Sequence, residues 1–277
     1  MEPDRLPAPT ATKTQEGSER APTEDRDAAA ASGSRLALPG LATQEPPMQA
    51  WLPTWGKEID DYIDELDTKT LKKLKKTYAG LGPALEELRK KLKNPAITAS
   101  ACRSELEAVR AVCRKADAHE AASSFPTNTE NNLIEYVNAK LLWERGDTSL
   151  TPGTTVKTKN KKGQTADMKP DYDAGGIIGD CVRIKKPAAP ATALIDNIGA
   201  DVTDKLTTYP ELNVRVVIDM TGSGGGAEAL KADLADTKTK IIQRLKTIEN
   251  SIISRMPRVD VVLPGDVVVR IDQAELR

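Results

Sequence analysis

Residues 169–187 read KPDYDAGGIIGDCVRIKKP, and the succession of residue types in this stretch decides the fold that we predict for the chain. A Pro-Asp pair lies in one strand-like segment, glycines make a turn, and a second strand-like segment follows. Because side chains alternate along a strand, Cys181, Arg183 and Lys185 share one side of the second segment. The stretch therefore predicts two neighbouring strands, with acidic side chains on the first and basic side chains on the second.

Helical and strand-like patterns alternate on both sides of this stretch. Helical patterns lie at 133–145, 191–208 and 227–255, and strand patterns lie at 154–160, 165–174, 180–186, 213–220, 259–263 and 267–271. The order is one helix, three strands, a helix, a strand, a long helix and two strands. This order predicts an α/β (α+β) fold with a mixed sheet in the C-terminal part of the chain.

The chain changes character twice before that region. Residues 1–50 are rich in Ala, Pro, Thr, Ser, Glu and Gln without apolar periodicity, which predicts a disordered leader. Residues 51–123 carry apolar residues at helical spacing, which predicts a small all-α helical segment before a domain at 124–277. An apolar cluster with Met48 and Trp51 at its centre either packs on these helices, the reading that we favour, or docks a partner.

The composition argues against several classes of function. Lys and Arg total 40 and Asp and Glu total 41, so any contact with nucleic acid must come from local basic clusters. Aromatic residues make up 3% of the chain, which argues against stacking of single-stranded bases. The 3 cysteines have no metal-ligand or CxxC spacing, which argues against zinc or redox chemistry.

The N-terminal sequence MEPDRLPAPT lacks the basic and then apolar pattern of a signal peptide, and no later segment reaches membrane-spanning length. We therefore expect a chain that is made in the cytoplasm. If it is exported, a delivery machine or carrier must engage it through the N-terminal segment, and it would then act in the cytoplasm of a target cell.

The acids and lysines around residues 169–187 predict a site for cleaving phosphodiesters. Such sites place an acid on one strand and an acid-x-Lys sequence on the next, because carboxylates hold a divalent cation while the lysine stabilises charge at the attacked phosphate. Asp171 follows Pro170 on the first strand, with Asp173 close behind, and Lys185 lies on the second strand. Glu135 on the preceding helix supplies a further carboxylate. We expect Glu135 and Asp171 to bind the cation, taken as Mg²⁺.

In these residues the chain resembles the C-terminal nuclease domains of contact-dependent growth-inhibition toxins and related polymorphic bacterial toxins, of the PD-(D/E)xK kind. The resemblance covers about residues 128–277 and runs through NLIEYVNAK, KPDYD, CVRIKKP, LIDNI and VRVVIDM. It implies a tRNA-cleaving activity, a cognate immunity protein as partner, and Glu135, Asp171 and Lys185 as site positions. In place of the glutamine that is usual in the crossing helix, the chain has Asp201, Asp204 and Lys205 nearby.

One residue departs from that pattern. Arg183 stands where the acid of acid-x-Lys is expected, and a guanidinium in place of a carboxylate changes the charge beside the cation by two units. Asp180 can move into the site, Asp173 can pair with Asp171, or Arg183 and Lys185 can steady the phosphate without a metal. The domain can also bind without cutting.

Two further motifs bear on phosphate binding. A lysine-rich hairpin arm lies beside the site, and further lysines next to the site extend it. The lysines that we expect to contact the RNA backbone are Lys157, Lys159, Lys161, Lys162, Lys169 and Lys186. The Gly-rich sequence TGSGGGAEAL at 221–230 connects a strand to a helix, a setting in which backbone N–H groups can receive phosphate. It lacks the spacing of a P-loop or of GxGxxG, so we interpret it as a connector.

Taken together, the sequence predicts a toxin-like effector nuclease that cleaves RNA, with tRNA as the favoured substrate and DNA as the less favoured one. The competing hypothesis is a non-catalytic interaction or assembly protein of a phage or secretion particle whose nuclease fold has lost its acid.

Overall fold

The structure is a computed structural model that describes residues 47–66, 80–117 and 127–277, with the side chains of 112–117 and 127–129 left out. All of these residues belong to one compact unit, Thr43–Arg277. The expected leader falls almost entirely outside the described residues, as does the expected boundary at residue 124. The expected fold class is confirmed, since helices precede a C-terminal mixed sheet.

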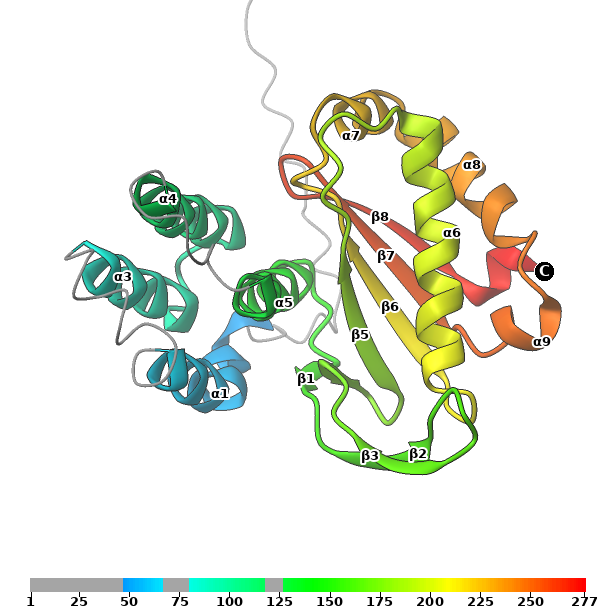
Figure 1. Ribbon diagram of the computed structural model, residues 1–277, viewed down its shortest axis with the longest axis horizontal. Coiled ribbons are helices and arrows are strands. Elements are labelled where there is room, and N and C mark those ends of the chain that lie inside the picture. Colours follow the sequence, from blue (N-terminus) through cyan, green and yellow to red (C-terminus); the bar gives the residue numbers. More distant parts are fainter. Residues whose placement is uncertain (1–46, 67–79, 118–126) are drawn as a thin grey trace, which may run out of the picture. The chain divides into compact units, whose positions relative to one another are not determined.

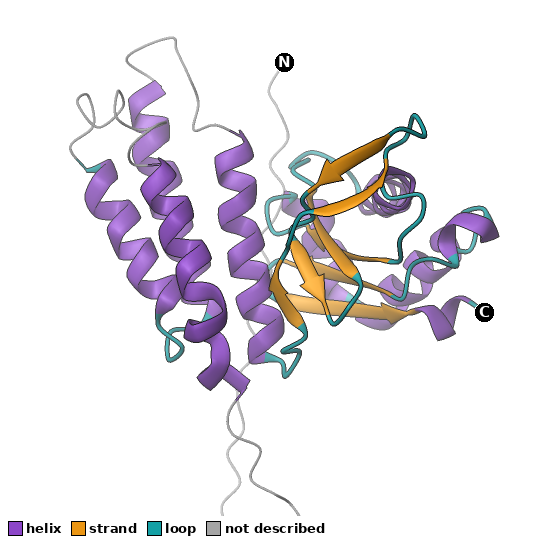
Figure 2. Ribbon diagram, turned by 90° about the horizontal axis from the view of Figure 1, so that it is seen from below, coloured by secondary structure: helices purple, strands orange, loops and turns teal. Residues whose placement is uncertain are grey.

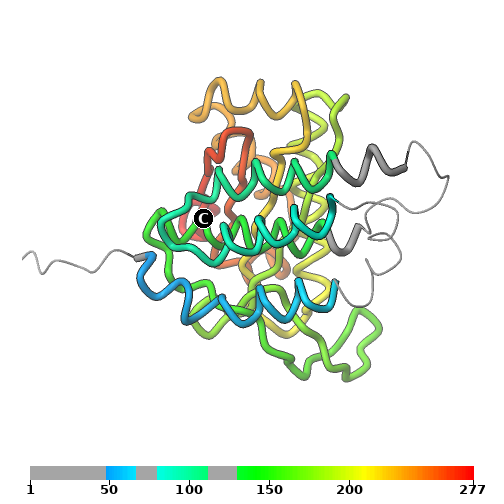
Figure 3. Tube along the Cα trace, turned by 90° about the vertical axis from the view of Figure 1, so that its left-hand side faces the viewer, coloured from blue at the N-terminus to red at the C-terminus, as the bar shows by residue number. Residues whose placement is uncertain are grey.

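Four helices form the first part of the described chain. After the 3-10 turn η1 (Pro47–Ala50) come α1 (Trp51–Glu65), α3 (Leu81–Lys93), α4 (Ala99–Asp117) and α5 (Thr127–Glu144). Apolar residues three and four positions apart give each of the first three helices one buried stripe. Figure 3 shows α1, α3 and α4 running side by side, in blue, cyan and teal.

The apolar cluster at the start of α1 packs on these helices, as favoured from the sequence. Trp51 is fully buried and its Nε1 donates to the Leu92 carbonyl oxygen at 2.7 Å. Trp55 stacks on Trp51 with ring centroids 5.4 Å apart, and its Nε1 donates to the Leu150 carbonyl oxygen at 3.2 Å. The indole N–H groups are thus paired, and the rings join the helices to the first strand of the sheet.

The sheet has six strands in the order β1-β4-β5-β6-β7-β8. Its strands are β1 (Leu150–Pro152), β4 (Tyr172–Ala174), β5 (Ile178–Arg183), β6 (Val214–Asp219), β7 (Arg258–Leu263) and β8 (Val267–Asp272). The pairs β5–β6 and β6–β7 are parallel and the other pairs are antiparallel. A separate antiparallel hairpin consists of β2 (Val156–Lys159) and β3 (Thr165–Met168).

Helices cover both faces of this sheet, as Figures 1 and 2 show. On one face lies α5, and alternate residues such as Val217 join its hydrophobic cluster. On the other face lie α6 (Ala191–Thr208) and α8 (Leu234–Leu245), and Val216 and Ile218 join theirs. The helices α1, α3 and α4 share the cluster of α5, so the helical segment and the sheet have one core in common.

Two expected elements are broken in the structure. The strand expected at 165–174 divides into β3 and β4, because Pro170 cannot donate to a sheet ladder. The helix expected at 227–255 divides into α7 (Gly224–Ala232), α8 and α9 (Asn250–Ile253). At the first break Asp233 is extended, with φ −135° and ψ 93°, and its carboxylate accepts the Asp236 N–H at 3.0 Å as an N-cap.

Candidate active site

From Asp180 onward β5 has no partner strand among the described residues on its β4 side, and the Asp171 side chain binds to that edge. β4 pairs with β5 at Ile178 and Gly179, the register stopping before Asp180. Just before β4 the chain turns at Pro170, and the Asp171 carboxylate accepts the backbone N–H of Cys181 at 2.6 Å. Asp171 therefore takes the place of the missing strand partner, and its carboxyl group lies against the centre of β5.

A second carboxylate and a lysine approach Asp171 from the face of β5 that carries α6. Asp180 pairs in register with Val216, whose side chain faces α6, and Asp180 is itself 4% exposed. Lys205 of α6 donates from Nζ to Asp180 Oδ1 at 2.9 Å. This lysine is the one that the fold brings to the acids.

Glu135 reaches the same place from α5. The Tyr172 hydroxyl donates to the Glu135 carbonyl oxygen at 3.0 Å, which ties this turn of α5 to β4. Burial, and then the nearby Asp180 charge, raise the pKa of Glu135. Burial also raises the pKa of Asp171, and the charges of Glu135 and Asp180 raise it further. We call Glu135, Asp171, Asp180 and Lys205 the acid cluster.

The acid cluster contains more carboxylates than its one ammonium group can neutralise. Three carboxylates against one ammonium leave two negative charges when all are ionised. Close carboxylates in a desolvated place resist ionising together, which is why the pKa values of Glu135 and Asp171 rise. The site therefore favours uptake of a proton or of another positive group.

The acid cluster fits a divalent cation in donor type and in charge, but not in spacing. Carboxylate oxygens are the donors that Mg²⁺ prefers, and two excess negative charges match one divalent ion. In the part of the chain that the structure describes, however, no three or more His, Cys, Asp or Glu side chains lie where they could hold a metal ion. The carboxylates would have to turn toward one another to bind a cation.

Two of the expected site residues do not join this cluster. Arg183 is on the α5 side of β5 and forms an ion pair with Glu130, and Lys185 Nζ lies 3.7 Å from the same carboxylate. Lys185 is four residues beyond Cys181, so about 13 Å of extended chain separates it from the backbone that Asp171 binds. The expected convergence of Lys185 with Glu135 and Asp171 is not seen, and Lys205 occupies the place by the acids.

Asp173 has a different neighbourhood again. Its Oδ1 accepts the Gly176 N–H at 3.0 Å, inside the turn that joins β4 to β5. Gly175 and Gly176 have φ values of 76° and 89°, so this turn needs glycine at both positions. The hydrogen bond of Asp173 holds the turn closed and keeps its carboxylate at this turn.

The lysines of the hairpin arm are exposed, and several are paired. Lys159 forms an ion pair with Glu211 at 2.6 Å, Lys161 with Asp204, and Lys169 with Glu58 at 2.9 Å. Lys186 donates to Asn197 Oδ1 at 2.7 Å. Lys157 and Lys162 are exposed on β2 and on its turn to β3. Exposed pairs of this kind open at little cost, so the arm keeps its capacity to meet phosphates.

Lys205 is the member of the acid cluster that the sequence interpretation did not assign to the site, and Asp180 was named there only as one of several alternatives. Lys205 stands beside Leu206 and three residues after Val202, both fully buried, so helical spacing puts it at the border of the buried face of α6. A lysine at such a border needs a partner on the sheet, which is a signal that the sequence contains. The free edge of β5, by contrast, depends on where β4 stops pairing.

Comparisons with known proteins give little further information. No protein-family model and no curated protein matches the chain. Among solved structures, a chain of the CdiA-CT/CdiI toxin and immunity complex from Burkholderia pseudomallei is 17% identical, with 55% of this chain and 94% of that chain covered and a TM-score of 0.32. A likeness of this size establishes neither a common fold nor a common activity.

Proposed function

We propose that the chain is a nuclease that cleaves phosphodiester bonds at the acid cluster. One observation carries the proposal: three carboxylates from α5, the loop before β4 and β5 converge with Lys205 at an unpaired strand edge. Perturbed carboxyl groups gathered around one charged partner are typical of catalytic sites. No helix among the described residues is long and apolar enough to cross a membrane.

The cluster contains the groups that this chemistry requires. Hydrolysis needs a base for the attacking water, an acid for the leaving oxygen and positive charge beside the phosphate. Burial raises the pKa of Glu135 to about 8, so this carboxyl can exchange protons closer to neutral pH than an ordinary one. Burial also raises the pKa of Asp171, which favours its protonated form. Lys205, held by Asp180, supplies the fixed positive charge. Chemistry supplied by a divalent cation is not part of the proposal, because the carboxylates among the described residues are not spaced to hold one.

RNA is the substrate that we propose, with tRNA first. The hairpin arm β2–β3 presents exposed lysines, and Lys169 at its base is close enough to lower the pKa of Glu135 against the stronger effect of burial. A basic arm that leads to an acid cluster suits a backbone recognised by shape and charge. The resemblance to toxin nucleases adds an effector role, a cognate immunity protein and a delivery carrier to this proposal.

The test is cleavage of purified tRNA and of duplex DNA by the full chain, with and without Mg²⁺. Asp171→Asn, Asp180→Asn and Lys205→Ala should each lower the cleavage rate by about a hundredfold or more, because each removes a charged group at the attacked phosphate. Asp173→Asn is the matched control, since its amide oxygen can still accept the Gly176 N–H and its position is only two residues from Asp171. Lys185→Ala should leave the rate constant for cleavage unchanged.

The result decides between two classes of protein. Intact tRNA and DNA after incubation with the folded wild-type chain at neutral pH and with Mg²⁺ would favour the non-catalytic assembly protein. The described carboxylates are not spaced as in a metal site, and this observation favours the non-catalytic alternative. Equal loss of rate in Asp173→Asn and Asp171→Asn would move the site to the turn between β4 and β5.

A further inference from the structure

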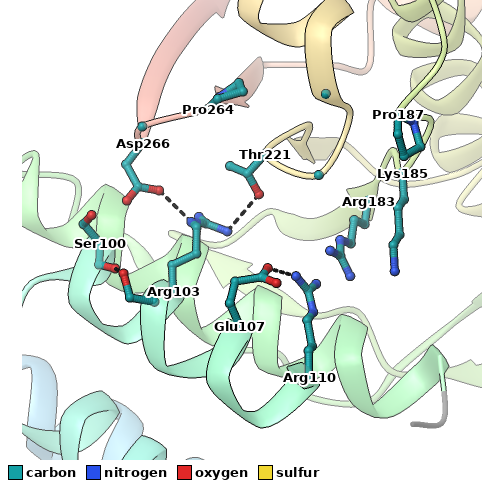
Figure 4. A pocket seen from close by; sticks show the side chains of 14 residues that line it. Ser100, Arg103, Glu107, Arg110, Arg183, Lys185, Pro187, Thr221, Pro264 and Asp266 are labelled. Carbon is teal, nitrogen blue, oxygen red and sulfur yellow. Dashed lines mark hydrogen bonds and ion pairs between the residues drawn. The ribbon is translucent and has the colours of Figure 1, made fainter. Parts of the chain in front are cut away.

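A cavity lies at the carboxyl end of β5, apart from the acid cluster. Its volume is about 540 Å³, and it is bounded by α4, by the loops after β5 and β6, and by the turn between β7 and β8. Figure 4 shows Arg110 rising from α4 toward Arg183 and Lys185, which come from the end of β5. A cavity of this size admits a small phosphorylated molecule.

Three cationic side chains in this cavity share one carboxylate. Arg110 and Arg183 both form ion pairs with Glu130 in the first turn of α5, and Lys185 Nζ lies 3.7 Å from it. Three positive charges face Glu130 and, at the rim of the cavity, Glu107, which leaves an excess of one. Arg110 also pairs with Glu107, but that carboxylate is 51% exposed at the rim, where solvent screens it. We call Arg110, Arg183 and Lys185 around Glu130 the basic pocket.

The two guanidinium groups are buried and incompletely bonded. The side chains of Arg110 and Arg183 are 7% and 5% exposed, and in the described part of the chain the Nε–H of each has no hydrogen-bond partner. A buried donor without a partner costs about 1–3 kcal/mol. Burial, and then the charge of Arg183, lower the pKa of Arg110 to about 10. Two desolvated cations thus share the Glu130 carboxylate, and Arg110 has a second, half-exposed partner in Glu107.

Arg103 also lines the cavity but is already satisfied. It donates to Asp219 Oδ2 at 2.8 Å, to Asp266 Oδ1 at 2.7 Å and to Asn138 Oδ1 at 2.8 Å. Through these bonds Arg103 fixes α4 on the sheet and forms one side of the cavity. The capacity for a ligand therefore lies with Arg110, Arg183 and Lys185.

The Gly-rich turn after β6 adds backbone donors to the same cavity. Gly222 and Gly224 line it, and Gly224 begins α7, whose first N–H groups have no partner within the helix. A Cβ on Gly222 would lie 3.3 Å from Arg183 Nη2, so glycine at this position leaves room for that guanidinium beside the turn. Gly224 has φ 62°, and a Cβ there would lie 2.6 Å from the Pro187 carbonyl oxygen. Glycine is thus required where the turn, the end of β5 and the cations meet.

We propose that the basic pocket binds a phosphate monoester through its dianionic head, held by Arg110, Arg183, Lys185 and the N-terminal backbone of α7. These cations attract a dianionic head more strongly than the single charge of a phosphodiester. The lining contains no aromatic side chain among the described residues, so recognition rests on the phosphate and not on a stacked base. The inference stands whether or not the acid cluster cleaves RNA.

The experiment is a calorimetric titration of the full chain with inorganic phosphate, AMP, and an RNA oligonucleotide with or without a 5′ phosphate. Lys185→Ala should weaken binding of phosphate and AMP at least about tenfold, since it removes one charge-assisted contact. The Lys185 side chain is 48% exposed, so this variant should keep the fold. Lys240→Ala is the matched control, with a side chain 52% exposed on α8 and outside the cavity lining.

Each outcome has a definite meaning. Saturable binding that Lys185→Ala weakens and Lys240→Ala does not supports the pocket, and preference for AMP or for the 5′-phosphorylated oligonucleotide identifies the source of the monoester. The absence of saturable binding by the folded wild-type chain overturns the inference. Equal affinity for oligonucleotides with and without the 5′ phosphate overturns it as well, because the diester backbone would then be the ligand.

Discussion

The acid cluster and the basic pocket lie on the same strand and leave charges of opposite sign uncompensated. Asp180 and Arg183 are three residues apart on β5, but Asp180 faces α6 and Arg183 faces α5. The first site has three carboxylates for one lysine, and the second has three cations for Glu130 and the half-exposed Glu107. Alternation along one strand thus separates two proposed sites that the sequence presents as a single run of charges.

Both sites differ from the charge networks that hold the fold. Arg215 donates to Asp260 at 2.6 Å and contacts Asp147 at 2.8 Å, and Arg270 also contacts both aspartates. The Arg103 network has the same completeness. A buried charge that meets several partners supports the fold, whereas one that lacks them is kept at a cost in stability. Completeness of partners therefore distinguishes structural from functional charge in this chain.

The largest effect should follow from breaking a complete network. Arg103→Ala removes the partner of Asp219, which is fully buried, and should lower the free energy of unfolding by about 3–5 kcal/mol. Urea denaturation of the full chain measures this. Lys240→Ala, which breaks an exposed pair with Asp236, should change stability by under about 1 kcal/mol. Similar values for the two variants would show that completeness of partners does not separate the classes.

An intermediate effect of opposite sign should follow from removing a charge in the acid cluster. Burial and Asp180 raise the pKa of Glu135 from 4.5 to about 8, so the folded chain binds protons that the unfolded chain releases. The stability that the Glu135 carboxyl group contributes is fully present below pH 4.5 and is lost as the pH rises through about 8. Glu135→Gln should therefore raise stability at pH 8 by about 2 kcal/mol, as measured by urea denaturation from pH 5 to 9.

Two comparisons sharpen that test. Mg²⁺ should stabilise the wild type at pH 8 more than it stabilises Glu135→Gln, if the cation relieves the same excess charge. Asp147 should behave in the opposite way: burial alone would raise its pKa, but Ser149 and Arg215 lower it from 3.8 to about 2. Its contribution is present above pH 3.8 and is lost as the pH falls toward 2. A Glu135→Gln variant less stable than wild type at pH 8 would identify Glu135 as a structural residue.

The sequence predicted the elements of this fold better than the assembly of its sites. The β-branched run of β6 and the apolar stripes of the helices are local patterns, and alternation correctly put Cys181 and Arg183 on one side of β5. The acid cluster depends instead on where β4 stops pairing and on the approach of Lys205, 25 positions from Asp180. The helix break at Asp233 was not predicted because the apolar helical period continues past it, whereas the break depends on a local N-cap at Asp233.

The smallest effect should come from the hairpin arm, whose charges lie outside both sites. Lys157 and Lys162 are exposed on β2 and its turn, and each contact that a lysine makes with phosphate adds about one to the slope of log affinity against log salt. Replacing both by alanine should reduce that slope for tRNA binding by about two and leave phosphate binding in the basic pocket unchanged. Filter binding by the Asp171→Asn chain at several salt concentrations measures the slope without cleavage. Lys240→Ala serves as the control, and a slope that falls equally there would mean that the arm is an ordinary solvated surface.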